Sequence, residues 1–277
     1  MISDRVLERL KTAAELPDLS GTRYRLIEEI GRGGMGIVYL CGDPELGRRV
    51  ALKVLDHPGE ARVLAGLEHP GVVPVHEAGT LADGRCYYAM KLVRGTRLDE
   101  FLRRVAHLPD RLRVFQKICE PVAFAHARGV VHRDLKPANI MVGEFGEVLV
   151  MDWGAPGAGT PAFMAPEQAS GQDVDGRADV FALGRILETV LKGERRVAKP
   201  LQSICQRATE RDREARYAGP LELSADIAAY LDHMPVSAHR ESMGERMLRF
   251  GSKNRTLLAL VAAYLAMRIA VIVWFAR

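Results

Sequence analysis

The chain has 277 residues, which is enough for two lobes that each bury a hydrophobic core. Its net charge of +4 is small, and it has no base-reading motif or basic-aromatic stripe, so we expect no nucleic-acid partner. The four cysteines are dispersed without a C-x-x-C pair, which predicts reduced cytosolic thiols rather than disulfides or a cysteine zinc site.

The N-terminus is not predicted to be a secretion signal, because charged residues rather than an apolar run follow Met1. Ile2, Val6 and Leu10 recur at a spacing that places them on one face of a helix. We therefore expect residues 1–23 to form a short amphipathic helix, which docks on the lobe that follows, and a linker.

A glycine-rich turn, Gly31-Arg32-Gly33-Gly34-Met35-Gly36, lies between two strand-like runs, Tyr24–Ile30 and Ile37–Leu40. Glycine lets the backbone approach phosphates closely, but this spacing also occurs in dinucleotide-binding folds and in plain β-turns. A dinucleotide-binding turn leads into a helix, whereas this one leads into a strand. Val50-Ala51-Leu52-Lys53 comes next on a further strand. Lys53 is either a surface lysine or, as its place after the glycine turn favours, a contact to nucleotide phosphates.

The run His132-Arg133-Asp134-Leu135-Lys136-Pro137-Ala138-Asn139 carries the most specific chemistry. Transfer of a phosphoryl group to a hydroxyl needs a carboxylate for the proton, a cation beside the phosphate and an amide oxygen for Mg²⁺. Asp134, Lys136 and Asn139 supply these groups on one short loop. Asp152-Trp153-Gly154 follows the predicted strand Glu147–Met151, and a carboxylate at a strand end suits a further Mg²⁺ ligand.

With two further runs, Gly159–Glu167 and Asp179–Gly184, these motifs resemble bacterial Ser/Thr protein kinases of the eukaryotic-like type. The resemblance extends from about Tyr24 to about His233. It implies an α+β, two-lobed protein kinase-like fold over residues 24–234, with a β-rich N-lobe over Tyr24–Leu92 and a helical C-lobe after it. Helices of the C-lobe are predicted near Pro109–Arg128, Asp179–Leu191 and Leu221–His233.

The resemblance also implies catalytic roles. Asp134 resembles the catalytic base, and Lys136 resembles the lysine that steadies the transferred phosphoryl group. Lys53 resembles the lysine that contacts ATP, and Glu60 resembles the helix C glutamate that pairs with it.

The implied cofactors are ATP and Mg²⁺, with Asn139 and Asp152 as the metal ligands. Met90 resembles the gatekeeper, and Lys91–Val93 resembles the hinge that hydrogen-bonds adenine. The implied ATP-binding residues are Ile30, Gly31, Arg32, Gly33, Gly34, Met35, Gly36, Val38, Ala51, Lys53, Met90, Lys91 and Val93.

Lys136 and Thr160 together follow the Ser/Thr rather than the Tyr kinase pattern, so the implied partner is a protein substrate with Ser or Thr. Glu167 and Arg216 resemble a buried ion pair that clamps the activation segment to the C-lobe. The alternative is that both are ordinary surface charges.

Three elements of the family are shortened in this sequence. Six residues separate the ATP lysine from the helix C glutamate, so the first turns of helix C are missing. Four residues separate Gly154 from Gly159 in the activation segment, and nine separate Leu191 from Leu201 in the helix G region. A dimer partner or the N-terminal helix could support the short helix C, so a homodimer is left open.

Two functions from different classes are consistent with these observations. The first is an active kinase that does not depend on loop phosphorylation, because Thr160 is the sole hydroxyl between Asp152 and Glu167. The second is an ATP-binding pseudokinase, a membrane-tethered scaffold or switch that transfers nothing. The intact catalytic and metal residues favour the enzyme, whereas the shortened elements favour the pseudokinase. A small-molecule kinase is disfavoured, because Gly159–Glu167 shapes a peptide site.

The C-terminal segment Leu257–Ala276 contains twenty residues and one charge, Arg268. As a helix it would be about 30 Å long, which matches the hydrocarbon core of a membrane. A central arginine costs about 2.5–3.5 kcal/mol on insertion scales, so a buried core helix and a helix lying on the membrane surface are alternatives. We expect residues 257–276 to be a transmembrane helix.

Basic residues in the preceding linker, residues 235–256, orient this helix. The positive-inside rule predicts a single-pass protein with its kinase domain at the cytoplasmic face of the cell membrane. Because the sequence ends one residue after the helix, we expect a tail-anchored signalling kinase or a piece of a receptor kinase. The basic residues are Arg246, Arg249, Lys253 and Arg255.

Overall fold

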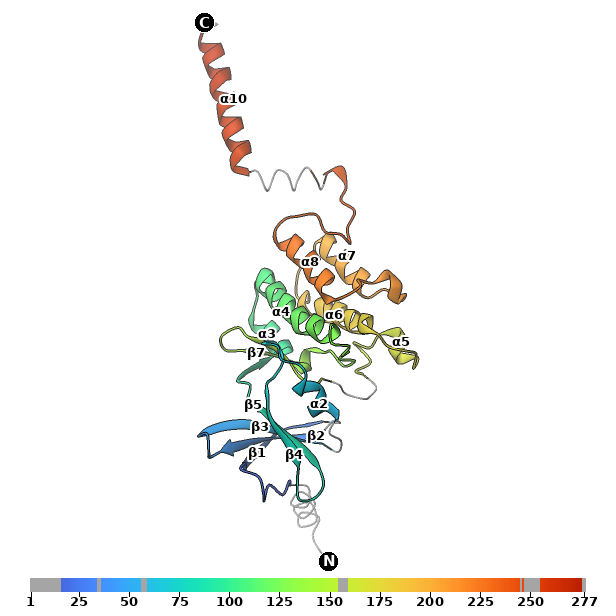
Figure 1. The fold of residues 1–277 in the computed structure, drawn as a ribbon. Helices are drawn as coiled ribbons and strands as arrows, with labels where there is room; N and C mark the ends of the chain where they lie inside the picture. Colours follow the sequence, from blue (N-terminus) through green and yellow to red (C-terminus); the bar gives the residue numbers. More distant parts are fainter. Residues whose placement is uncertain are drawn as a thin grey trace, which may run out of the picture.

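The computed structural model describes residues 16–33, 36–55, 59–153, 159–244, 246 and 255–275. Figure 1 shows a β-rich lobe formed by the first part of the chain and a helical lobe formed by the part that follows. The predicted two-lobed α+β arrangement is therefore confirmed. The predicted N-terminal helix, Gly34, Met35 and Gly154 lie outside the described residues.

The N-lobe is built on a five-stranded antiparallel sheet with the order β1-β2-β3-β5-β4. A strand follows the glycine-rich turn, as predicted, because β1 and β2 pair directly across that turn. The strands are β1 (Arg25–Gly33), β2 (Gly36–Asp43), β3 (Arg48–Leu55), β4 (Val75–Thr80) and β5 (Cys86–Lys91).

The central strand β3 is buried on both faces, and this determines the direction of Lys53. Val50, Leu52 and Val54 belong to one hydrophobic cluster, whereas Ala51 belongs to another. Side chains alternate along a strand, so Lys53 lies on the face of Ala51. Only 3% of Lys53 is exposed, which makes it an interior charge rather than a surface lysine.

A short helix, α2 (Gly59–Ala65), follows β3 and stands where helix C is expected. It has seven residues, which is about two helical turns. Its buried residues are Glu60, Ala61 and Leu64, and it packs against β4. The short spacing in the sequence therefore produces a short helix rather than a displaced one.

The C-lobe begins with a three-stranded sheet, ordered β6-β7-β8, beneath a group of helices in which α4 packs against α6 and α8. Pro109 lies in the first turn of α4 and Pro220 in that of α8, where a missing backbone N–H costs nothing. The three predicted helices are found within three residues of the expected ends. The elements are β6 (Gly95–Arg97), α3 (Leu98–Arg104), α4 (Leu108–His126), the 3₁₀ helix η1 (Pro137–Asn139), β7 (Ile140–Gly143), β8 (Val148–Val150), α5 (Pro166–Ala169), α6 (Gly176–Val190), α7 (Lys199–Ala208), the 3₁₀ helix η2 (Arg213–Ala215) and α8 (Pro220–Leu231).

One buried carboxylate fastens the end of the C-lobe. Asp226 in α8 accepts hydrogen bonds from the Tyr217 hydroxyl at 2.8 Å, from Ser237 N at 2.7 Å and from Ala238 N at 3.0 Å. Val236 beside them is buried. Packing of the C-lobe thus continues a few residues beyond the expected domain end at residue 234.

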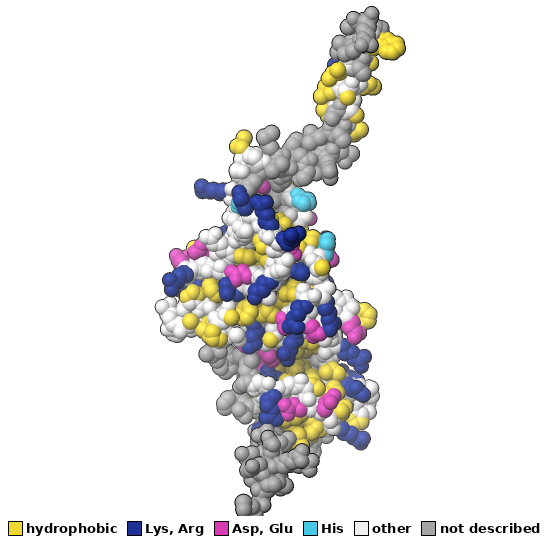
Figure 2. All heavy atoms as spheres, turned by 180° about the vertical axis from the view of Figure 1, so that it is seen from behind, with side chains coloured by type: hydrophobic (Ala, Val, Ile, Leu, Met, Phe, Trp, Pro, Cys, Tyr) yellow, Lys and Arg dark blue, Asp and Glu magenta, His cyan; other side chains and the backbone are white. Residues whose placement is uncertain are grey.

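A final helix, α10 (Arg255–Phe275), covers most of the predicted C-terminal hydrophobic segment. Figure 2 shows hydrophobic side chains along it, while acidic and basic side chains are interspersed over the rest of that face. Counted over the residues that the structure describes, no helix combines the length and the apolar character needed to cross a membrane. The transmembrane helix therefore stays a prediction.

Candidate active site

A cavity of about 520 Å³ opens between the two lobes. Its walls come from β1, β2, β3 and β5, from the segment after β5, and from β6, α3, η1, β7 and the residues after β8. Of the predicted ATP-binding residues, those that line it are Ile30, Gly31, Val38, Ala51, Met90, Lys91 and Val93. The other described ones, Arg32, Gly33, Gly36 and Lys53, are outside this lining.

Sequence reasoning missed several residues of this cavity. Met141 lies on β7, and Met151 immediately precedes the predicted metal ligand Asp152. Both flank motifs that were recognised, and this proximity was the available signal. The other missed lining residues are Gly95, Thr96, Arg97, Glu100 and Ala138.

Gly36, at the start of β2, is required by close packing against β3. Its φ is +126°, and a Cβ atom there would lie 2.1 Å from the Val54 carbonyl oxygen. No side chain fits that space, because real Cβ contacts are never so short. At this position, then, the glycine loop is fixed by the neighbouring strand as well as by any phosphate it binds.

Lys53 lies at the centre of a buried ionic cluster. Its Nζ donates to Glu60 Oε1 at 2.8 Å, to Glu60 Oε2 at 3.0 Å and to Asp152 Oδ1 at 2.8 Å. Burial alone would lower the pKa of Lys53, but the carboxylates of Asp152 and Glu60 outweigh it and raise the pKa. The predicted pairing of Lys53 with Glu60 is therefore present, although α2 is short.

Asp134 is held by hydrogen bonds on both carboxylate oxygens. Oδ1 accepts from Thr160 N and Thr160 Oγ1, each at 2.9 Å. Oδ2 accepts from Lys136 Nζ at 2.6 Å, and the same Nζ donates to Thr160 Oγ1 at 2.9 Å. Burial alone would raise the pKa of Asp134, but the bonds from Lys136 and Thr160 more than offset it and lower the pKa. Asp134 is thus an ionised acceptor at neutral pH.

Asp179 in α6 anchors the loop that carries Asp134. Its Oδ2 accepts from His132 N at 2.8 Å, and its Oδ1 accepts from Arg133 N at 2.9 Å. Arg133 has a φ of +68°, an unfavourable conformation for a residue with a side chain. His126 Nε2 at the end of α4 lies 2.7 Å from the same carboxylate. The motif containing Asp179 was recognised in the sequence, but this anchoring role was not.

The two predicted metal ligands offer hard oxygen donors, Asn139 next to Asp134 and Asp152 next to Lys53. Asn139 donates its amide nitrogen to Asp134 O at 2.9 Å, which leaves its amide oxygen as the group that could bind a cation. Asp152, at φ +57°, follows β8 and contacts Lys53 through one oxygen. An amide and a carboxylate oxygen suit Mg²⁺, which takes its remaining ligands from phosphates and water.

The residues that the structure describes contain no group of three or more His, Cys, Asp or Glu side chains able to hold a metal ion. A site completed by nucleotide phosphates does not require such a group. The donor set therefore fits the cation that the family uses.

The predicted ion pair of Glu167 and Arg216 is confirmed and buried. Arg216 donates from its two terminal nitrogens to the two oxygens of Glu167, at 2.6 and 2.8 Å. Its Nε donates to Glu210 O at 2.7 Å. Burial alone would raise the pKa of Glu167, but the Arg216 hydrogen bonds outweigh it and lower the pKa. The pair joins α5, directly after the activation segment, to the segment before α8.

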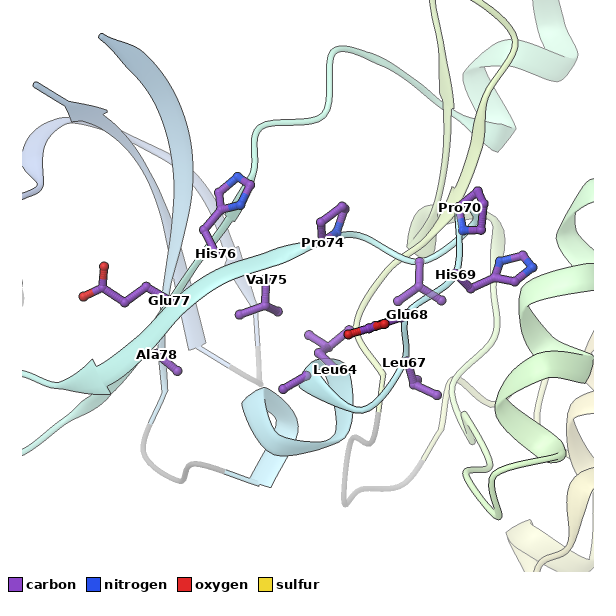
Figure 3. Close-up of a pocket in the computed structure, with 12 residues that line it drawn as sticks. Leu64, Leu67, Glu68, His69, Pro70, Pro74, Val75, His76, Glu77 and Ala78 are labelled. Atoms are coloured by element: carbon purple, nitrogen blue, oxygen red, sulfur yellow. The ribbon is translucent and has the colours of Figure 1, made fainter. Parts of the chain in front are cut away.

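A second cavity, of about 620 Å³, lies between α2 and β4 (Figure 3). Its lining comes from α2, from the segment after it and from β4, with Leu64 and Val75 among the side chains. The predicted site residues do not line it. It matters for the site because it borders α2, the helix that carries Glu60.

Comparison with known proteins agrees with this geometry. The sequence profile of the protein kinase domain matches residues 24–256. The chain is 33% identical to serine/threonine-protein kinase PknD of Chlamydia felis, over 77% of this chain and 31% of that protein. It is 31% identical to PknD of Protochlamydia amoebophila, over 76% of this chain and 30% of that protein. The chain therefore spans about a third of the length of these curated relatives.

Among solved structures, the kinase domain of PknI from M. tuberculosis is similar, with a TM-score of 0.61 and 26% sequence identity. The match covers 76% of this chain and 96% of that domain. The fold, the clustered motifs and these relatives agree, so the chain belongs to the protein kinase domain family and is of the bacterial Ser/Thr type, as its sequence predicted.

Proposed function

We propose that this chain is an active Ser/Thr protein kinase, which transfers the γ-phosphate of Mg·ATP to hydroxyl groups of protein substrates. The observation that carries the proposal is the bonding of Asp134. Its carboxylate is oriented on both oxygens by Lys136 and Thr160, at 2.6–2.9 Å. A scaffold that only binds nucleotide has no need of this arrangement.

In the proposed mechanism, Asp134 orients the substrate hydroxyl and accepts its proton. Its lowered pKa keeps the carboxylate ionised, so it can accept a hydrogen bond from the hydroxyl. Lys136 is paired with Asp134 Oδ2 and would stabilise negative charge on the phosphoryl group during transfer. Lys53, held by Glu60, would contact the α- and β-phosphates.

Adenine would enter the cavity between the lobes, beside Met90 and the hinge at Lys91–Val93. The described ATP-binding residues that do not line this cavity would lie around the phosphates rather than around adenine. Asn139 and Asp152 would hold Mg²⁺, which neutralises phosphate charge when bound.

The first experiment compares the full chain with Asp134→Asn, using Mg·γ-labelled ATP and a generic basic protein as substrate. We expect label transfer by the wild type and a fall of at least about a hundredfold in the variant, since general-base catalysis contributes about 10²–10⁴. Binding of ATP to both proteins without transfer by either would favour the pseudokinase alternative. Equal transfer by both would remove Asp134 from the proposed mechanism.

We also propose that activity does not require phosphorylation of the activation segment. Thr160 is the sole hydroxyl between Asp152 and Glu167, and its side chain bonds to Asp134 and Lys136. Phosphatase-treated protein should therefore keep its activity. Loss of activity, with a phosphosite mapped to residues 155–166, would contradict this.

A membrane anchor at the C-terminus is proposed from the sequence and from the exposure of α10. Leu260, Leu265 and Ile269 are all more than half exposed, so they have little protein surface to pack against. Basic residues before the helix favour a cytoplasmic kinase domain. We expect the full chain to sediment with membranes and to resist carbonate extraction. Release by carbonate would instead favour a helix lying on the membrane surface.

A further inference from the structure

We propose that Tyr88 is a positioning residue of this active site, whose hydroxyl holds Glu60 in place for Lys53. The inference rests on the proposed function, in which Lys53 contacts the phosphates of ATP. Tyr88 acts through Glu60 and touches neither nucleotide nor substrate.

The geometry places Tyr88 within the ionic cluster. The antiparallel register of β3 and β5 sets Tyr88 directly opposite Lys53. The Tyr88 hydroxyl donates to Glu60 Oε1 at 2.7 Å, the same oxygen that accepts from Lys53 at 2.8 Å. Tyr88 is 1% exposed, so this hydroxyl has no access to bulk water.

Protonation of Tyr88 is secure across the working pH range. Burial, followed by the charge of Glu60, raises the pKa of its phenol well above the ordinary value. The hydroxyl is therefore a permanent donor, and the carboxylate is its acceptor.

The short α2 explains why Glu60 needs a second partner. Glu60 is the second residue of a seven-residue helix, so little helix precedes it. The cavity of about 620 Å³ lies against the same helix, with Leu64 (Figure 3) and also Ala65 in its wall. Three of the seven residues of α2 are buried, so packing alone holds it less firmly than it would hold a longer helix. A hydrogen bond from the central sheet would limit movement of α2 at the residue where it matters.

When ATP binds, its phosphates compete with Glu60 and Asp152 for the N–H donors of Lys53, and this competition gives the Tyr88 hydroxyl a specific role. The ammonium group has three donors, and the structure shows two contacts to Glu60 and one to Asp152. A phosphate oxygen must take at least one of these donors when ATP binds. Whichever donor Lys53 gives up, the Tyr88 hydroxyl keeps Glu60 Oε1 bonded while Lys53 turns.

Tyr88 could also serve the core alone, because its ring belongs to the large hydrophobic cluster. The neighbouring Tyr87 provides a matched control. It is 5% exposed, lies on the other face of β5 in the second cluster, and donates its hydroxyl to Glu77 Oε1 at 3.0 Å. Tyr87 and Tyr88 lie on the same strand, and removing either hydroxyl deletes one hydrogen bond to a carboxylate. Of the two, Tyr88 is the one that faces the active site.

The test uses the full chain and its Tyr88→Phe and Tyr87→Phe variants. The dissociation constant of Mg·ATP is measured by calorimetry, and kcat and KM are measured for ATP and for a protein substrate. We expect Tyr88→Phe to weaken Mg·ATP binding about tenfold and to lower kcat/KM for ATP by at least as much, because a hydrogen bond to a charged group is lost. Its KM for the protein substrate should not change, and Tyr87→Phe should remain within about twofold of the wild type for every constant.

A double-mutant cycle with Glu60→Gln tests whether Tyr88 acts through Glu60. We expect the effect of Tyr88→Phe on Mg·ATP binding to disappear in the Glu60→Gln background. Additive effects, equal effects of the two Tyr→Phe variants, or no change in Tyr88→Phe would each overturn the proposal.

The binding measurement separates this proposal from the proposed function. A wild type that binds Mg·ATP but transfers no phosphate would contradict the proposed kinase activity, while the dissociation constants would still test Tyr88. A wild type that does not bind Mg·ATP would overturn both.

Discussion

Each lobe contains a buried ion pair, Lys53–Glu60 in the N-lobe and Glu167–Arg216 in the C-lobe, and the two pairs are built differently. In the C-lobe, Glu167 and Arg216 meet in a two-bond, fork-like contact, and Arg216 also donates to a backbone carbonyl. In the N-lobe, Lys53 divides its donors between Glu60 and Asp152. Arg216 is bonded to one carboxylate in one geometry, whereas Lys53 has two carboxylate partners and can shift between them.

The supports of the two pairs differ in the same way. Arg216 is 3% exposed, although its partner Glu167 lines a cavity of about 560 Å³. Besides Glu167, Arg216 donates to three backbone carbonyls, those of Glu210, Arg177 and Arg211. Within the part of the chain that the structure describes, Lys53 has carboxylate acceptors and no backbone acceptor, and the side chain of its partner Asp152 is 32% exposed. A fixed pair suits a clamp, and an adjustable pair suits a site that must admit a nucleotide. Similar chemistry therefore serves stability in one lobe and binding in the other.

The largest expected effect tests the clamp. Arg216→Ala should lower the free energy of unfolding by about 3–5 kcal/mol, because it leaves the Glu167 carboxylate buried without its partner. Urea unfolding of the full chain measures this. Arg103→Ala is the control, since Arg103 forms an exposed pair with Asp99 and should cost less than about 0.5 kcal/mol. Similar losses in the two variants would show that the buried pair is no clamp.

Loss of the adjustable pair, Lys53–Glu60, should lower activity more than it lowers stability. Lys53→Met should lower kcat/KM by at least about a hundredfold, because the phosphates lose a fixed cation. The loss of unfolding free energy should be about 1 kcal/mol, since Glu60 keeps its hydrogen bond from Tyr88 and Asp152 is already partly exposed. A loss as large as that of Arg216→Ala would break the comparison between the lobes.

A smaller effect is expected at the glycine turn. Gly36→Ala places a Cβ atom against the Val54 carbonyl oxygen at a positive φ, so β2 must shift. We expect Mg·ATP binding to weaken about tenfold while the C-lobe keeps its stability. Gly47→Ala is a matched control, because Gly47 also has a positive φ but open space around it. Equal effects would assign the loss to backbone strain rather than to the contact with β3.

The smallest effect is a pH dependence. The folded-state pKa of Glu167 is lowered from 4.5, so the pair stabilises the protein above pH 4.5. That contribution is lost as the pH falls through the lowered folded-state pKa. The free energy of unfolding, measured on both sides of this range, should therefore change more steeply with pH in the wild type than in Arg216→Ala.

The pKa of Asp134 is lowered from 3.8, so this carboxylate should stay ionised above pH 3.8. Its protonation should therefore not limit kcat there, which a pH profile of kcat would check.

The sequence predicted those parts of the site that lie in contiguous motifs. The roles of Lys53, Asp134 and Asn139 are predicted from runs of a few residues, and the structure pairs Lys53 with Glu60 and places Asn139 against Asp134. Glu60 could be aligned because helix C follows β3 directly. The two lobes and the C-lobe helices were also predictable, from strand alternation and helical periodicity.

Contacts between distant segments could not be predicted in this way. Asp179 reaches the catalytic loop across 46 residues, and Tyr88 reaches Glu60 across 28. Neither residue type indicates such a partner, because a buried aspartate or tyrosine bonds whatever the fold brings near it. The register of β3 and β5 decides that Tyr88 faces Lys53, and register is set by the whole sheet.

The fastening at Asp226 has a mechanical consequence. Force applied to the chain from the side of α10 would load His239, whose ring lies 3.1 Å from the Ser203 hydroxyl, and then Ser237 and Ala238, whose backbone N–H groups are tied to that carboxylate. These bonds would have to break before the load reached Tyr217 and the helices behind it. The C-lobe is thus shielded from tension in its own tail, and the catalytic loop can keep its geometry while the end of the chain is pulled.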